Sequence, residues 1–176
     1  MQRHLLANHT LGGRCLDGSM ALYYYQPPIV PLSPPVWVLY LEGGANCFTE
    51  ATCRARAATP LGSSNYWNAT WTPATSATGT EYGVLSDNAT VNPDFAGAHR
   101  VFVPYCSADD HLGMRTETSA TWGFFFSGHL NFRAIVHHLS TSNAAFRRTV
   151  VSGRGARVLL TGASAGGVGT FGNVDW

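Results

Sequence analysis

Lysine is absent from this chain of 176 residues, and all eleven of its basic residues are arginine. The absence excludes Schiff-base, Ser-Lys and Tyr-Lys chemistry from this stretch of sequence. Charged residues make up only 12% of the chain, about half the usual share, and the formal net charge is +1. Nothing in this balance favours binding to nucleic acid or to an anionic membrane surface.

Long apolar runs are also missing from the sequence. No segment approaches the roughly 18 apolar residues of a membrane-spanning helix, so we expect no membrane span. The first eight residues contain too short an apolar core for a signal peptide, and we expect the chain to start within a domain. The length fits one domain or a large piece of one.

The four cysteines, at positions 15, 47, 53 and 106, form no Cys-x-x-Cys pair, and no histidine stands at zinc-finger spacing. We therefore expect no metal site. Three disulfide pairings are possible, and four buried free thiols are the alternative. The sequons at Asn8, Asn68 and Asn88 are acceptors for N-glycosylation and favour secretion.

Residues 158–167 read Val-Leu-Leu-Thr-Gly-Ala-Ser-Ala-Gly-Gly. A short apolar run leads directly into Gly-x-Ser-x-Gly and then into small residues that can open a helix. This order is typical of a nucleophile elbow, in which Ser164 would stand on a strained turn between strand and helix. Glycines two positions before and after the serine would let the two backbones approach closely. The motif alone is weak, because a sequence rich in glycine and serine also produces it by chance.

A second segment supplies context for this serine. Residues 36–42 form an apolar run that leads into Gly43 and Gly44. Hydrolases with a nucleophile elbow take one oxyanion amide from the residue after the serine and another from an upstream glycine-rich loop. The two segments occur in the required order, although a plain turn is the alternative interpretation of the glycine pair.

The rest of the chain indicates an α/β organisation. Apolar residues spaced at i, i+3, i+4 and i+7 predict a helix over about 129–140. Residues 50–98, rich in Gly, Ser, Thr, Asn and Pro, are expected to form a loop-rich insertion with short helices. Apolar strands separated by helix predict a mostly parallel sheet that is covered on both faces. The expected strands are 36–42, 100–106 and 156–161, with a strand or hairpin within 13–25.

Short motifs follow one another nearly from end to end of the chain. They are Cys15-Leu16-Asp17-Gly18-Ser19, Leu41-Glu42-Gly43-Gly44 followed by Cys47 and Cys53, Leu61-Gly62-Ser63-Ser64, Gly83-Val84-Leu85-Ser86, Asn92-Pro93-Asp94-Phe95, Pro104-Tyr105-Cys106-Ser107, the elbow itself, and Asn173-Val174-Asp175. In this order and spacing they resemble the pectin acetylesterase/Notum family of carboxylesterases. The resemblance implies an α/β-hydrolase fold, a three-layer sandwich, together with secretion and ester hydrolysis by a Ser-Asp-His triad.

The resemblance also implies roles for individual residues. Ser164 matches the nucleophile, and the positions of Gly44, Ala45 and Ala165 match those whose amides form the oxyanion hole. The resemblance also favours the disulfides Cys47–Cys53 and Cys15–Cys106 among the pairings left open above, and the implied secretion would preserve them. Neither a metal nor an organic cofactor is needed, and we expect the full-length protein to be an extracellular or cell-wall monomer.

Two departures from the family pattern affect function. The family usually has a bulky aromatic residue after the glycine pair, whereas this chain has Ala45 and Asn46, which would reshape the acyl pocket. The family's acid and base follow the serine, as hydrolase order requires. Here Asp175 is the only acid after Ser164, and it falls in the expected helix. No histidine follows, and none of the seven upstream histidines, at 4, 9, 99, 111, 129, 137 and 138, fits the base in this order.

These departures shape our expectation for the whole chain. We expect residues 1–176 to be the N-terminal portion of a single α/β-hydrolase domain, incomplete at its C-terminus and inactive alone. The strand at 156–161 would then expose an edge that carries Val158, Leu159 and Leu160. His137 and His138 are expected on a helix surface, and His111 and His129 in loops.

The expected reaction is removal of acetyl groups from pectin, because a small Ala45 and a polar Asn46 do not indicate a lipid tunnel. A Notum-like esterase that removes a palmitoleoyl group from a protein is the alternative, and an inactive fragment or binding domain is another. A Rossmann oxidoreductase is disfavoured by the displaced third glycine and by the missing Tyr-x-x-x-Lys pair. A trypsin-like protease is disfavoured because Ala163 stands where an aspartate belongs.

Overall fold

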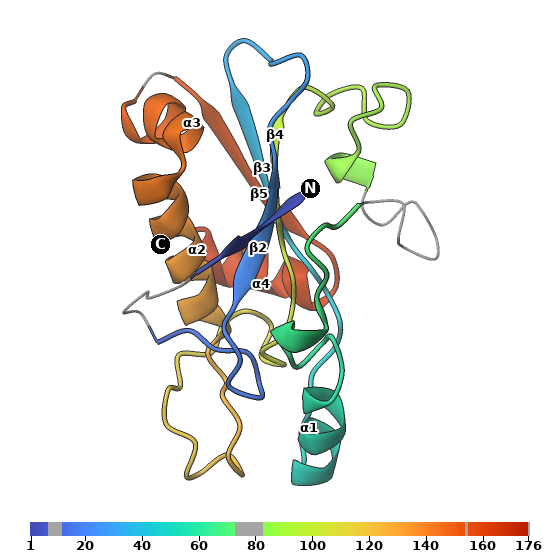
Figure 1. The fold of residues 1–176 in the computed structure, drawn as a ribbon, viewed down its shortest axis with the longest axis vertical. Helices are drawn as coiled ribbons and strands as arrows, with labels where there is room; N and C mark the ends of the chain where they lie inside the picture. The colour runs from blue at the N-terminus through green and yellow to red at the C-terminus, as the bar shows by residue number, and fades with distance from the viewer. Residues whose placement is uncertain (7–11, 73–82, 154, 176) are drawn as a thin grey trace.

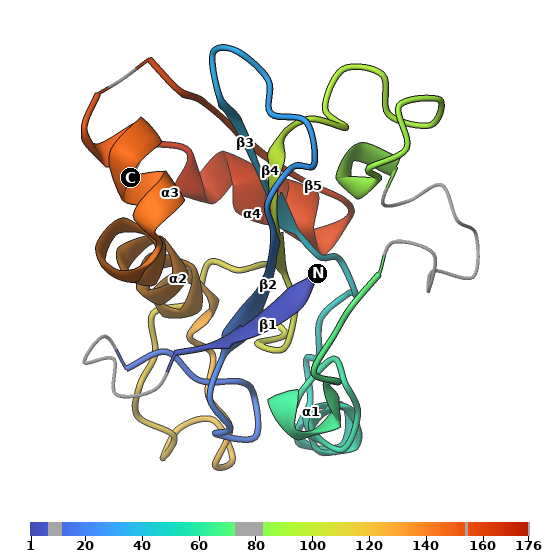
Figure 2. The same ribbon diagram turned by 45° about the horizontal axis from the view of Figure 1, so that its top comes forward.

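A five-stranded sheet forms the centre of the molecule (Figures 1 and 2). The computed structural model describes residues 1–6, 12–72, 83–153 and 155–175. The strands lie in the order β1-β2-β4-β3-β5. Their bounds are Gln2–Leu5 for β1, Leu22–Gln26 for β2, Val36–Leu41 for β3, His99–Val103 for β4 and Arg157–Gly162 for β5.

The sheet is mixed. Strands β4, β3 and β5 run parallel to one another, and these are the three strands expected from the apolar runs. Strand β2 pairs antiparallel with β4, and β1 pairs antiparallel with β2. Two of the four strand pairings are therefore antiparallel, which is a larger share than in the mostly parallel sheet that the sequence predicts. Strand β1 was not predicted, because three of its four residues, Gln-Arg-His-Leu, are polar and most of them are exposed.

Helices cover one face of the sheet, and loops with short 3-10 turns cover most of the other. Helix α2 (Gly128–Ser142) follows the expected helix closely, and buries Phe132, Ile135 and Leu139 against the sheet. Helix α4 (Ala165–Asn173) lies on the same side as α2 (Figure 2). The remaining helices are α1 (Glu50–Ala57), α3 (Ala144–Phe146), η1 (Ser64–Tyr66), η3 (Gly83–Leu85) and the π-helical η4 (Arg147–Val151).

Strand β3 is buried on both faces, which explains its unbroken apolar sequence. Trp37, Leu39 and Leu41 pack into the core under α2, whereas Val38 and Tyr40 pack into a second core on the opposite face. The second core is closed partly by side chains from the 50–98 segment, which contains α1, η1 and η3. Residues 73–82 of that segment lie outside the described residues.

Two disulfides fix the loops around the sheet. Cys15 bonds to Cys106, with Cα atoms 4.9 Å apart, and Cys47 bonds to Cys53, with Cα atoms 5.0 Å apart. Both pairings agree with those that the resemblance favours. The Cys47–Cys53 bond ties α1 to the loop after β3, where Thr49 also caps the helix in a capping box. None of the described helices is both long enough and apolar enough to cross a bilayer.

The loop after β3 and the elbow after β5 pack backbone against backbone. A Cβ on Gly166 would overlap the carbonyl oxygen of Leu41, and a Cβ on Gly162 would lie 2.6 Å from the carbonyl carbon of Gly166. A Cβ on Gly43 would lie 2.5 Å from the carbonyl oxygen of Ala163. Close approach therefore requires glycine at these positions, as the sequence pattern predicts.

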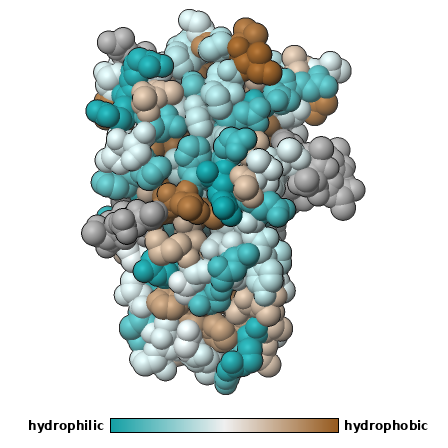
Figure 3. Space-filling model, in the orientation of Figure 1, coloured by the Kyte–Doolittle hydropathy of each residue, from teal (hydrophilic) through white to brown (hydrophobic). Residues whose placement is uncertain are grey.

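Strand β5 is the outer strand of the described sheet, and its second edge and parts of both faces are open. Val158 is 47% exposed, although it stands in an apolar strand. A groove of about 430 Å³ runs along one face of β5, and one of about 450 Å³ runs along the other. Leu159 borders both grooves. Elsewhere, hydrophobic residues form small separate groups on the face shown in Figure 3.

We predict that residues 1–176 self-associate in solution through β5, because an open apolar edge pairs readily with another chain. Val158→Lys should shift the mass measured by size exclusion with light scattering towards the monomer. Val168→Lys is the matched control, since Val168 is 49% exposed but stands on α4. A wild-type chain that is monomeric and melts cooperatively would contradict the prediction.

A second prediction compares two adjacent glycines of α4. Gly166→Ala should destabilise the chain by about 1–3 kcal/mol, because its new methyl group overlaps the end of β3. Gly167→Ala should instead stabilise it by about 0.5–1 kcal/mol, since its nearest neighbour would lie 3.4 Å away and alanine favours helix. Urea denaturation at low protein concentration measures both. Equal changes in the free energy of unfolding for the two substitutions would show that close packing between α4 and the end of β3 does not determine stability at this position.

Candidate active site

Ser164 stands on a strained turn between β5 and α4. Its backbone angles are φ 52° and ψ −123°, whereas a residue in the left-handed helical region has ψ near +47°. Such an outlier costs on the order of 1–3 kcal/mol and persists only when its surroundings enforce it. The residue is exposed, and the next residue, Ala165, is buried and begins α4. The turn therefore presents the serine to solvent at the N-terminus of a helix.

The glycine-rich loop after β3 lies directly against this turn. A Cβ on Gly43 would stand 2.9 Å from the Cβ of Ser164. Gly44 has φ 153°, and Ala45 has φ 56°, a conformation that non-glycine residues seldom adopt. The structure thus brings together the two segments that were expected to form one site, although they are about 120 residues apart in the chain.

Arg56 of α1 fixes the orientation of this loop. Its Nη2 donates a hydrogen bond of 2.6 Å to the carbonyl oxygen of Gly44, and its Nε donates one of 3.1 Å to the carbonyl oxygen of Leu61. Its guanidinium also lies 5.3 Å from the ring centroid of Tyr105. In a trans peptide the carbonyl and the following N–H point in opposite directions. The N–H of Ala45 is therefore turned away from Arg56.

Asn46 takes part in a closed set of hydrogen bonds with Tyr105 and Asp110. The Tyr105 hydroxyl donates to Asn46 Oδ1 at 2.6 Å, and Asn46 Nδ2 donates to Asp110 Oδ2 at 2.9 Å. The backbone N–H of Asp110 completes the set by donating to the Tyr105 hydroxyl at 2.8 Å. Burial raises the pKa of Tyr105, so the hydroxyl keeps its proton. Both polar ends of the Asn46 side chain are thus engaged within the protein.

Sequence reasoning identified the serine and the glycine pair but missed the groups that hold them. Arg56 stands three residues after Cys53 on α1, and no motif marks it. Tyr105 belongs to a motif that was noted only as part of the resemblance. The sequence offered one signal for Arg56: the expected Cys47–Cys53 disulfide, which places α1 beside the glycine-rich loop after β3.

Histidines contribute to the structure and, in the described part of the chain, none hydrogen-bonds Ser164. His111 is buried, and its Nε2 donates to the carbonyl oxygen of Glu42 at 2.9 Å. His129 lies in the first turn of α2, not in a loop, and its Nδ1 is 2.6 Å from Oδ1 of Asn173. His138 is half-buried and contacts the Tyr23 hydroxyl, whereas His137 is exposed. His9 lies outside the described residues.

Acidic residues near the site also have structural partners. Asp109 is buried and accepts hydrogen bonds from the Ser107 hydroxyl at 2.6 Å and the backbone N–H of Gly128 at 2.8 Å. Burial raises the pKa of Asp109 to about 6. Asp175 was expected within the helix after the elbow, but α4 ends at Asn173 and Asp175 lies exposed in the turn that follows. Among the described residues, no group of three His, Cys, Asp or Glu side chains is placed to hold a metal ion.

We predict that His111 makes the folded state sensitive to mild acid. Burial lowers the pKa of His111 to about 4, so the unfolded state binds more protons between pH 6.5 and 4. This contribution to stability is therefore lost as the pH falls through that range. His111→Gln keeps a donor for the Glu42 carbonyl and should flatten the dependence. Asp109 has a raised pKa and therefore adds stability as the pH falls, but it does so equally in the wild type and in His111→Gln. The difference between the two proteins in unfolding free energy, measured by urea denaturation at pH 7 and pH 4.5, therefore reports the effect of His111. Parallel pH profiles would contradict the prediction.

Comparisons with known proteins agree with this geometry. The chain is 35% identical over 164 residues to the palmitoleoyl-protein carboxylesterase NOTUM of Schmidtea mediterranea, covering 92% of this chain and 28% of the relative. It is 36% identical over 166 residues to pectin acetylesterase 4 of Arabidopsis thaliana, covering 94% of this chain and 36% of the relative. The chain thus spans about a third of the length of these curated relatives.

A solved structure shows the same fold. The Wnt deacylase Notum from Drosophila superposes with a TM-score of 0.79 at 32% identity, covering 99% of this chain and 46% of that protein. The family profile described as Pectinacetylesterase matches residues 1–176. These matches leave no support for the oxidoreductase and protease alternatives. The chain is an α/β-hydrolase-like member of the pectinacetylesterase family, whose characterised relatives are carboxylesterases.

Proposed function

We propose that this chain carries the nucleophile and oxyanion hole of a serine carboxylesterase that removes acetyl groups from pectin. The observation that carries the proposal is the contact between Gly43 and the strained turn at Ser164. That contact places a glycine-rich loop beside an exposed serine, as acyl-transfer chemistry requires.

The proposed reaction begins with attack of the Ser164 hydroxyl on the ester carbonyl. Amides of Gly44, Ala45 and Ala165 hold the resulting oxyanion, each contributing about 3 kcal/mol when well placed. Arg56 supports this role because it turns the Ala45 N–H away from itself. Water then releases the acyl group, without a metal or an organic cofactor. In this proposal the acid and base of the triad come from outside these 176 residues. Among the described residues, no histidine is hydrogen-bonded to Ser164.

The acetyl group is favoured over a long acyl chain by the residues after the glycine pair. Ala45 carries only a methyl group, and Asn46 is held by Tyr105 and Asp110. An apolar tunnel for a palmitoleoyl chain is normally lined by hydrophobic side chains. The identities to NOTUM and to pectin acetylesterase 4 are nearly equal, so the residues around the serine decide the proposal. A Notum-like activity on a lipidated protein remains the second candidate.

Secretion and glycosylation belong to the same proposal. The two disulfides fit an oxidising compartment. Asn68 and Asn88 are exposed, as N-glycosylation requires, whereas Asn8 lies outside the described residues. We further infer that the complete enzyme acts as a monomer in the extracellular space or cell wall.

We predict that residues 1–176 alone hydrolyse p-nitrophenyl acetate no faster than their Ser164→Ala variant. Without a triad base, an oxyanion hole and binding leave only about 10³–10⁴-fold acceleration over water. Turnover that Ser164→Ala abolishes would contradict the prediction and show that a base is present. Persistent lack of turnover in a longer transcript-derived protein with a later Asp and His would favour an inactive binding domain instead.

The same longer protein tests the acyl group. Release of acetate from acetylated pectin, with little hydrolysis of a palmitoleoylated peptide, is the expected result. The reverse preference would replace the pectin proposal with the Notum-like one. Ser164→Ala is the control for both substrates.

A further inference from the structure

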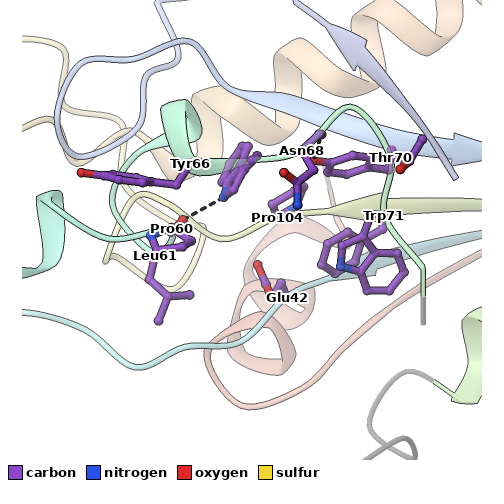
Figure 4. A pocket seen from close by; sticks show the side chains of 11 residues that line it. Glu42, Pro60, Leu61, Tyr66, Asn68, Thr70, Trp71 and Pro104 are labelled. Carbon is purple, nitrogen blue, oxygen red and sulfur yellow. Dashed lines mark hydrogen bonds between the residues drawn. The ribbon is translucent and has the colours of Figure 1, made fainter. Parts of the chain in front are cut away.

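A cleft of about 170 Å³ opens on the face of the sheet opposite α2, beside the end of β3. Tyr66, Trp67 and Trp71 supply aromatic walls. Glu42, Asn68 and Thr70 supply polar groups. In Figure 4, Glu42 and Asn68 lie on opposite sides of the open space, with Trp71 at one end and Tyr66 at the other.

The walls of the cleft are held in place by the rest of the protein. The indole N–H of Trp67 donates to the carbonyl oxygen of Pro60 at 2.9 Å, as the dashed line in Figure 4 marks. The Trp71 ring stacks on Phe102 with centroids 3.9 Å apart. The Tyr24 hydroxyl donates to the carbonyl oxygen of Asn68 at 2.7 Å. The cleft is therefore formed before any ligand arrives, as ligand sites usually are.

The cleft lies next to the candidate active site. Glu42 is followed directly by Gly43, which contacts the turn at Ser164. Ala163, which precedes the serine, packs against the same core cluster as Trp67 and Trp71. A ligand in the cleft would thus be a near neighbour of an ester bound at Ser164.

The chemistry of the walls indicates the ligand. Aromatic rings offer flat apolar surfaces, which suit the C–H face of a sugar ring. The Glu42 carboxylate and the Asn68 amide can accept hydrogen bonds from hydroxyl groups around that ring. Among the described residues that line the cleft, Glu42 carries the only charge, and its carboxylate would repel the carboxylate of an acidic sugar. The volume is below the roughly 300 Å³ of a typical drug-sized site, which fits one ring better than a long acyl chain.

From these observations we infer that the cleft binds one uncharged pyranose unit of the substrate polysaccharide, next to the unit whose ester is cleaved. The inference rests on the proposed function, because it takes the substrate to be a polysaccharide. It adds a preference for methyl-esterified over free uronic acid at this position. It also replaces the expectation of a glycan on Asn68 with an unmodified Asn68 in the active enzyme, since a glycan there would occupy the cleft, and it leaves Asn88 as the acceptor among the described residues.

Tryptophan fluorescence of residues 1–176, produced without N-glycosylation, tests this inference. The probe is a fully methyl-esterified galacturonic acid hexamer, compared with its demethylated form. We expect saturable binding that is at least fivefold tighter for the methyl ester. Tyr66→Ala should weaken binding at least fivefold, because the Tyr66 ring forms one wall of the cleft; it is 54% exposed and belongs to none of the core clusters, so its loss should not disturb the fold. The matched control is Trp122→Ala, since Trp122 is 48% exposed and lies far along the chain in another loop.

A second variant tests the role of charge. Glu42→Gln keeps an oxygen that can accept the Tyr105 backbone N–H, which lies 2.8 Å from Glu42 Oε2. It should reduce the preference for the methyl ester to less than twofold. Absence of saturable sugar binding, equal effects of Tyr66→Ala and Trp122→Ala, or displacement of the sugar by palmitoleate would each overturn the inference. Because the readout is binding, loss of esterase activity in the longer protein would refute the proposed function separately.

Discussion

Close backbone contact between the end of β3 and the turn after β5 is the constraint on which the candidate site depends. Gly43, Gly162 and Gly166 have no room for a side chain at this junction. The contact holds Ser164 in a conformation that an isolated chain would leave, at a cost on the order of 1–3 kcal/mol. Burial of β3 on both faces provides the stabilisation that offsets this cost, because its six residues are almost entirely removed from solvent.

The loop that we propose to supply the oxyanion amides depends on a second support. Glycines that allow unusual angles also leave the loop free to adopt others. Here α1 restricts that freedom through the Cys47–Cys53 bond and through Arg56, whose two donors reach Gly44 and Leu61. A short helix held by a disulfide thus restricts the conformation of this loop, as side-chain packing restricts the strands in the core.

The elements that could be predicted from sequence are those fixed by local patterns. Strands β3, β4 and β5 and helix α2 follow from apolar runs and periodicity, and the glycine spacing around Ser164 gives the turn. Strand β1 was missed because its four residues are polar or exposed and show no apolar alternation, although the strand pairs along its whole length with β2. The interactions of Arg56 and Asn46 join distant segments, and a single sequence carries no signal of such pairing. His129 was assigned to a loop although it lies in the first turn of α2, because the apolar periodicity that predicts this helix begins only at Phe132.

The two sides of the candidate site differ in the groups that they offer for recognition of a substrate. On the side of Asn46, polar atoms pair with Tyr105 and Asp110, so little is left to recognise the acyl group beyond its size. On the side of Glu42, aromatic walls and a carboxylate face an open cleft. In the proposed function, specificity would come from the alcohol part of the ester, because recognition by hydrogen bonds and flat apolar contact discriminates more strongly than a small apolar pocket does. A polysaccharide ester meets this requirement, since its alcohol part is the sugar.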